Sequence, residues 1–151
     1  MKEIPDLGES EELEVGNIKE VWNSYDLADG AKVRARIIIT KILWPKGVKS
    51  VQDVRSLVGA SFQSIVVVFA PQHLKGPKND TPPPVDEARK MRIEEVEVLR
   101  SSEEWNIYEL PGNRGKLKAK MIVSSIHKVP GLFNQDGDPY YVVNSTIAVG
   151  P

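Results

Sequence analysis

Basic residues alternate along two stretches of the chain, and their type and spacing fit a binding chemistry. Side chains two residues apart in a strand share one face, so each stretch would present a row of cations, called a basic ladder below. Two ladders side by side could hold the phosphates of a nucleic acid. The ladders consist of Lys32, Arg34 and Arg36 in the first half of the chain, and Lys116, Lys118 and Lys120 in the second.

Acidic residues offer a structural role for the same cations. Four glutamates also alternate on expected strand faces, and cross-strand ion pairs with the ladders would stabilise a sheet without binding any ligand. We favour this second interpretation, although the sequence leaves both open. The glutamates are Glu12, Glu14, Glu95 and Glu97.

Aromatic residues near the ladders could stack on bases or sugars. They belong to two copies of the motif Trp-Asn-x-Tyr-acid-Leu. Because Trp and Tyr are three residues apart, they point to opposite faces of a strand, and one of each pair is expected in the core. We favour a role in the shared fold over a stacking platform. The four residues are Trp22, Tyr25, Trp105 and Tyr108.

The sequence predicts no catalytic residue, no cofactor and no metal site. Asn134, Asp136 and Asp138 alternate as in a calcium loop, but the terminal glutamate of such a loop is missing, and these residues are common in turns. Neither of the two histidines lies in a catalytic motif. The chain has no cysteine, which excludes disulfides and zinc–thiolate sites.

The two motif copies point to an internal duplication. Between residues 11–27 and 94–110, nine of seventeen positions are identical at a constant spacing of 83 residues. The similarity continues through the ladders after a one-residue insertion in the intervening turn. A weaker third block aligns residues 63–68 with 144–149. Duplicated units usually pack against each other, so one compact domain is expected.

The apolar periodicity is mostly two, which predicts a mainly β fold. We expect four strands per half, forming an eight-stranded barrel or two packed sheets related by a pseudo-two-fold axis. Ile38 and Ile122 should then be buried near that axis, and residues 50–57 could form a short helix.

Three segments follow from this organisation of the chain. Residues 1–72 form the first β repeat, residues 73–90 a proline-rich linker, and residues 91–151 the second β repeat. The net charge of −1 gives no global field that would attract nucleic acid or an anionic membrane. With neither a signal peptide nor a long apolar run in view, we expect a cytoplasmic protein without a membrane partner.

Turn and strand signals also resemble those of a known group of chains. Residues 25–33 and 136–145 are similar to a pattern in small uncharacterised archaeal β-rich proteins, which run Tyr-x-Leu-x-Asp-Gly, then a basic and apolar strand, then Gly-x-Pro-x-Tyr. Here the unit occurs twice, with the Gly-x-Pro-x-Tyr element only in the second copy. The resemblance implies an archaeal source and carries no function.

Three functions compete at this point. The first is a non-enzymatic interaction or structural module, whose partner is another protein or a second copy of the chain. The second is a nucleic-acid-binding β module that uses the paired basic strands. The third is an enzyme with its site in the loops that differ between the halves, residues 44–61 or 128–139. The repeat without a catalytic motif favours the first.

Overall fold

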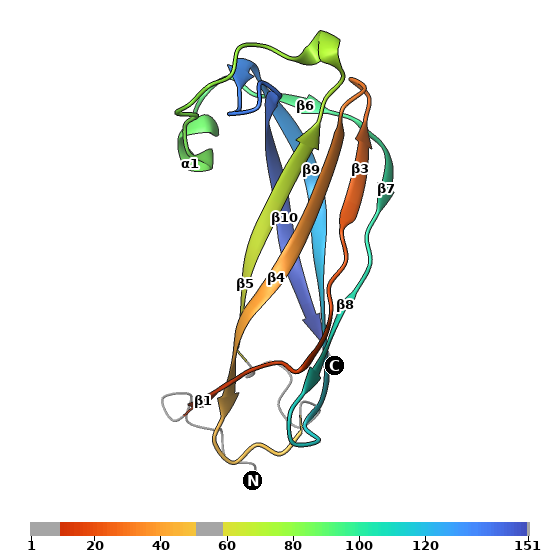
Figure 1. Cartoon of the computed structure of the whole chain (residues 1–151), viewed down its shortest axis with the longest axis vertical. Coiled ribbons are helices and arrows are strands. Elements are labelled where there is room, and N and C mark those ends of the chain that lie inside the picture. The colour runs from red at the N-terminus through yellow and green to blue at the C-terminus, as the bar shows by residue number, and fades with distance from the viewer. Residues whose placement is uncertain (1–9, 51–58, 151) are drawn as a thin grey trace.

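The computed structural model describes residues 10–50 and 59–150 and shows a mainly β protein with two antiparallel sheets (Figure 1). Long strands run along the long axis of the molecule, and the two short helices lie near one end. The elements are β1 (Ser10–Leu13), β2 (Asn17–Lys19), β3 (Asn23–Leu27), β4 (Lys32–Pro45), β5 (Gly59–Phe69), the 3-10 helix η1 (Gln72–Leu74), α1 (Val85–Ala88), β6 (Glu94–Val96), β7 (Val98–Ser102), β8 (Asn106–Leu110), β9 (Gly115–Phe133) and β10 (Pro139–Gly150).

Each sheet is built around one long strand. In the first sheet, β4 pairs with β5 along one edge and with β3 and then β1 along the other. In the second sheet, β9 pairs with β10 along one edge and with β8 and then β6 along the other. The alternating, β-branched sequence of β4 explains why such a long strand forms and pairs on both edges.

Two short strands are exchanged between the halves of the chain. β2 comes from the first half but pairs with β8 in the second sheet, and β7 comes from the second half but pairs with β3 in the first sheet. In the described part of the chain each half thus has five strands, where the sequence predicts four. The exchange joins both halves into one unit.

The strand registers recur between the halves at spacings of 83 or 84 residues. Two further details match: β4 has an irregularity between Ile39 and Lys41, and β9 has one at the corresponding place, opposite the irregularity between Asn144 and Ser145. Ser64 faces Ile37 and Ile147 faces Met121, so β5 and β10 correspond at a spacing of 83, two residues away from the alignment predicted above. The matching pairs are Tyr25–Val33 with Tyr108–Leu117, Ser101–Tyr25 with Ile18–Tyr108, and Leu13–Ile42 with Val96–Ile126.

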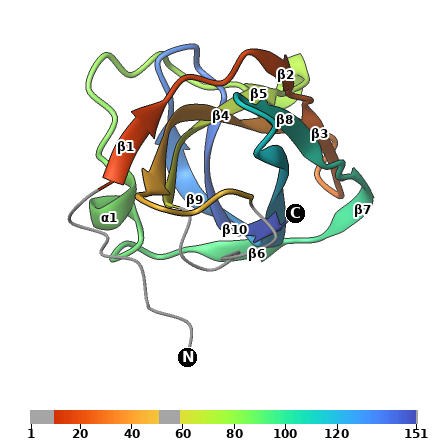
Figure 2. The same ribbon diagram turned by 90° about the horizontal axis from the view of Figure 1, so that it is seen from below.

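Apolar side chains of both sheets form a common core, and the end-on view shows the strands arranged around it (Figure 2). Alternate residues of β4 and β9 point into it. The prediction for Ile38 and Ile122 is wrong, because the alternation continues through the apolar stretches and turns both residues outward: Ile122 is 39% exposed. The inward residues include Val33, Ala35, Ile37, Leu117, Ala119 and Met121.

The proline-rich segment contacts the second half of the chain. The N–H of Gly76 donates to the carbonyl of Gly137 at 2.9 Å, and the Tyr140 hydroxyl donates to the carbonyl of Pro83 at 2.7 Å. The helix expected at residues 50–57 falls almost wholly outside the described residues. Among those described, no helix has the length and apolarity needed to cross a membrane.

Candidate functional site

The asparagine of each Trp-Asn-x-Tyr motif is buried between the two halves. Asn23 is 2% exposed. Its side-chain amide donates to the carbonyl of Met121 at 2.9 Å and to the hydroxyl of Tyr25 at 3.2 Å. Its oxygen accepts the backbone N–H of Glu104 at 3.3 Å. Two of these three partners belong to the opposite half of the chain, so the motif connects the halves.

The second motif repeats the arrangement. Asn106, also 2% exposed, donates to the carbonyl of Ile37 at 3.3 Å and to the hydroxyl of Tyr108 at 3.1 Å. Its oxygen accepts the N–H of Val21 at 3.0 Å. Asn23 and Asn106 therefore have matching hydrogen-bond partners, and at both positions the asparagine satisfies buried polar groups of the opposite half.

Each motif tyrosine donates to a glutamate of the opposite half. The Tyr25 hydroxyl lies 2.7 Å from Glu103, and the Tyr108 hydroxyl lies 3.1 Å from Glu20. Burial, together with these carboxylates, raises the pKa of both phenols, so the hydroxyls stay protonated and can donate. Each carboxylate also accepts one backbone N–H at 2.8 Å, Glu103 from Val123 and Glu20 from Ile39.

These networks assign the tyrosines to the fold. Tyr25 and Tyr108 are buried, whereas Trp22 is half-buried and Trp105 is exposed, as the three-residue spacing predicts. Sequence reasoning missed the two glutamates, although Glu20 and Glu103 are among the nine positions that are identical between residues 11–27 and 94–110. The available signal was a glutamate that stands three residues before the asparagine in both motif copies.

The basic ladders lie on the outward faces of the two sheets. Their residues alternate with core residues in β4 and β9, so both ladders point away from the shared interior and do not line a common groove. Lys32, Lys116 and Lys118 are exposed, and Arg34, Arg36 and Lys120 are half-buried.

Three ladder cations stack on the motif tryptophans. The guanidinium carbons of Arg34 and Arg36 lie 5.0 and 5.3 Å from the centroid of the Trp22 ring. The Lys120 ammonium lies 5.6 Å from the centroid of the Trp105 ring. Distances of this size are typical of cation–π interactions. They hold Arg34, Arg36 and Lys120 against the tryptophan rings.

The four glutamates predicted as ladder partners do not take that role. Glu12 forms an ion pair with Lys41 at 3.0 Å, and in the described residues Glu14, Glu95 and Glu97 form none. Arg36 instead lies 3.8 Å from Glu20, the carboxylate that also accepts the Tyr108 hydroxyl. The reason is the register: β1 pairs with Ile42–Pro45 of β4 and β6 with residues 126–128 of β9, beyond the stretches that carry the ladders.

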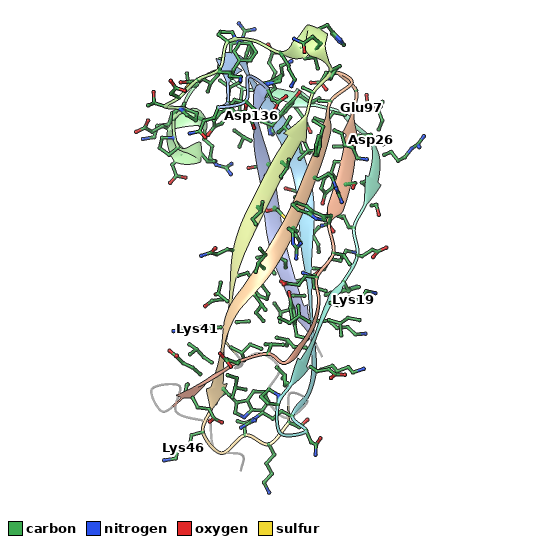
Figure 3. All side chains as sticks on the ribbon, in the orientation of Figure 1. Lys19, Asp26, Lys41, Lys46, Glu97 and Asp136 are labelled. Atoms are coloured by element: carbon green, nitrogen blue, oxygen red, sulfur yellow. The ribbon has the colours of Figure 1, made fainter. Side chains whose placement is uncertain are left out.

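The second sheet presents the more open basic surface. Lys118 lies opposite Ile107, and Ile107 lies opposite Lys19, so the three side chains form one row across β9, β8 and β2. Figure 3 marks Lys19 on this side of the molecule. Trp105 beside this row is 42% exposed, so an aromatic ring and several cations are accessible together. On the first sheet, Trp22 is instead covered by two arginines.

The outer strands of both sheets carry no charged residue. β5 reads GASFQSIVVVF and β10 reads PYYVVNSTIAVG. In the described part of the chain, each pairs with a strand on one edge only. Apolar side chains on both strands are exposed to solvent: Ile65, Val66, Phe69, Ile147 and Val149.

Of the two asymmetric segments, residues 128–139 contain a hydrogen-bonded turn, whereas residues 51–58 of the segment 44–61 lie outside those that the structure describes. The Asn134 side-chain oxygen accepts the N–H groups of Asp136 and Asp138, both at 2.9 Å, which fixes the turn. No group of three or more His, Asp or Glu side chains in the described residues is placed to hold a metal ion. A cavity of about 530 Å³ adjoins Trp44, but Arg114 beside it already pairs with Glu11 at 2.6 Å.

Comparisons of the chain with protein-family models, with curated proteins and with solved structures found no match. The fold and the side chains therefore carry the functional argument.

Proposed function

We propose that this chain is a non-enzymatic interaction module, built from two copies of one β unit, which binds an extended protein segment at the free edge of β5. The observation behind this proposal is the composition of that edge. β5 has eleven residues, none charged and none proline, and it exposes Ile65, Val66 and Phe69.

Such an edge is unusual in a protein that works alone. A free strand edge presents unpaired N–H and C=O groups to any other chain, and natural proteins commonly protect it with lysine, proline or a covering segment. Here the lysines and arginines lie on the inner neighbour β4 instead. An added strand would complete the backbone hydrogen bonds of β5 and cover its apolar side chains, which is β-strand addition.

The recurrence of the strand registers supports the duplication part of the proposal. The buried Asn-Tyr-Glu networks occur twice, and each crosses between the halves. A duplicated unit with exchanged strands acts as an internal dimer, which gives a rigid frame for an exposed edge strand. In this proposal the motif residues stabilise the fold, and the edge of β5 binds the partner.

A labelled extended peptide tests the proposal directly. The peptide would alternate Val and Thr and carry a Lys at each end. Increasing amounts of the chain would be added to it, at concentrations below any self-association of the chain, and binding would be measured by fluorescence anisotropy. Binding should weaken in Val66→Lys and persist in Val149→Lys, which changes the corresponding position on β10. A peptide methylated at alternate backbone nitrogens is the control. If the wild-type chain binds neither peptide, edge addition is refuted.

A nucleic-acid-binding module is the second candidate, favoured by the accessible ring of Trp105 beside the row containing Lys19 and Lys118. Single-stranded nucleic acids bind such surfaces through phosphate contacts and base stacking. Affinity should then fall steeply with salt. Lys118→Gln should reduce both affinity and salt slope, whereas Lys32→Gln on the other sheet should not. Absence of binding at low salt rules this candidate out.

A further inference from the structure

The two free edges differ in how much of each the rest of the chain contacts. Near the start of β10, the Tyr140 hydroxyl donates to Pro83, Arg89 donates to Asn144, and Ala88 packs in a small apolar cluster with β9 and β10. Figure 1 shows α1 beside this end of β10. In the part of the chain that the structure describes, no strand pairs with the outer edge of either β5 or β10, but residues 72–92 form no hydrogen bond or ion pair with β5.

We propose that the segment covering the β5 edge is β5 of a second copy of this chain, paired antiparallel across a two-fold axis. This inference rests on the proposed function, because it names the partner of the same edge. Two copies of a strand can pair in this way only in an isologous contact, where the same patch is used twice. The result would be a continuous sheet through both molecules.

The absence of charge on β5 favours a second copy over a different protein. In a self-paired strand, a charged side chain near the two-fold axis would come within cross-strand reach of its own counterpart, and like charges there are destabilising. A strand that selects a different partner commonly uses complementary charges for specificity. β5 has no charged residue, whereas the adjacent β4 carries Lys32, Arg34, Arg36 and Lys41.

The side-chain order of β5 selects a register. A two-fold axis at Val67 places Ile65 opposite the partner's Phe69 on the outward face, and Val66 opposite the partner's Val68 on the inward face. All these pairs are apolar, and pairs of an aromatic with a β-branched residue are among the favourable ones. An axis at Val66 would place Phe69 opposite the polar Gln63. The Val67 register is therefore preferred.

Sedimentation velocity over a range of concentrations tests the dimer. The wild-type chain should shift from monomer to dimer as concentration rises, and it should stop at the dimer because an isologous contact closes. Val66→Lys should remain monomeric, since two lysines would face each other diagonally across the axis. Val149→Lys is the matched control, because Val66 is 43% and Val149 44% exposed on corresponding edge strands.

Circular dichroism would verify that each variant is folded. If Val66→Lys does not fold, Ile65→Lys on the outward face of the same strand takes its place. A wild-type chain that stays monomeric into the hundred-micromolar range overturns the inference. So does a dimer that Val149→Lys disrupts, or growth beyond the dimer. If the peptide described above still binds the monomer, the proposed function stands and only the choice of partner is wrong.

The absence of cysteine permits a second test of the register. Opposite residues in an antiparallel pair have Cα atoms about 4.5–5.5 Å apart, within the range of a disulfide. Val67→Cys should therefore form a covalent dimer on mild oxidation, and Val149→Cys should not. Equal cross-linking at both positions would indicate random collision and contradict the pairing of β5.

Discussion

The buried asparagines give the most direct test of how the halves are joined. We predict that Asn106→Ala destabilises the fold, because it removes three hydrogen bonds at a residue that is 2% exposed. The change leaves the carbonyl of Ile37 and the N–H of Val21 without this partner. Leaving two such groups unpaired should lower the free energy of unfolding by about 2–4 kcal/mol.

The corresponding substitution should behave in the same way. Asn23 has equivalent contacts, with the carbonyl of Met121 and the N–H of Glu104 as its backbone partners. Asn23→Ala should therefore cost an amount similar to Asn106→Ala. Against a total stability of about 5–15 kcal/mol for typical domains, either loss is large enough to measure.

Urea denaturation followed by circular dichroism would measure these losses. Asn106→Asp separates the contributions, because aspartate keeps the acceptor for Val21 but cannot donate to Ile37 or Tyr108. Thr146→Ala on an exposed strand position is the control and should change stability by less than about 0.5 kcal/mol. Losses below about 1 kcal/mol for both alanine variants would refute the role assigned to the networks.

Three further outcomes are expected from the packing and the titrating groups. Gly76→Ala should destabilise the fold, because an added Cβ would overlap the ring of Phe133, whereas Gly16→Ala meets nothing within 4 Å and should be tolerated; thermal melts of both would show the difference. Ile37→Ala should cost about 2–5 kcal/mol and Ile38→Ala clearly less, since only Ile37 points into the core; urea midpoints that reverse this order would contradict the strand orientation. Burial raises the pKa of the buried tyrosines Tyr25, Tyr108 and Tyr141 above the unfolded value of about 10. Because the folded state then keeps protons that the unfolded state releases, the free energy of unfolding should fall as pH rises past about 10. A urea midpoint that does not change in this pH range would contradict the expectation.

Much of the local structure could be predicted because it depends on neighbouring residues. Period-two alternation places Lys118 outward beside the inward Ala119, and the three-residue spacing in the motif separates Trp22 from Tyr25. The turn at Gly30, with φ of 97°, follows from the conformational freedom of glycine in the Asp-Gly sequence.

The candidate site was predictable only in part. Each ladder lies on one face of its strand, as the alternation predicts, but the two ladders do not lie side by side. Their neighbours come from other segments: Trp22 stacks on Arg34 and Arg36, and Glu20 pairs with Arg36. Pairing between distant segments depends on register and topology, which alternation within one strand does not encode.

The sequence by itself determined that the chain is mainly β, that two stretches share one pattern, and that the basic residues of each long strand share one face. Only the tertiary structure decided that β2 and β7 are exchanged between the halves, that Asn23 and Asn106 are buried at the junction, and that Ile38 and Ile122 face outward. The physical reason is that burial and hydrogen bonding belong to pairs of segments. Whether an apolar residue is buried, or a strand edge is left unpaired, depends on which other segments of the folded chain lie beside it.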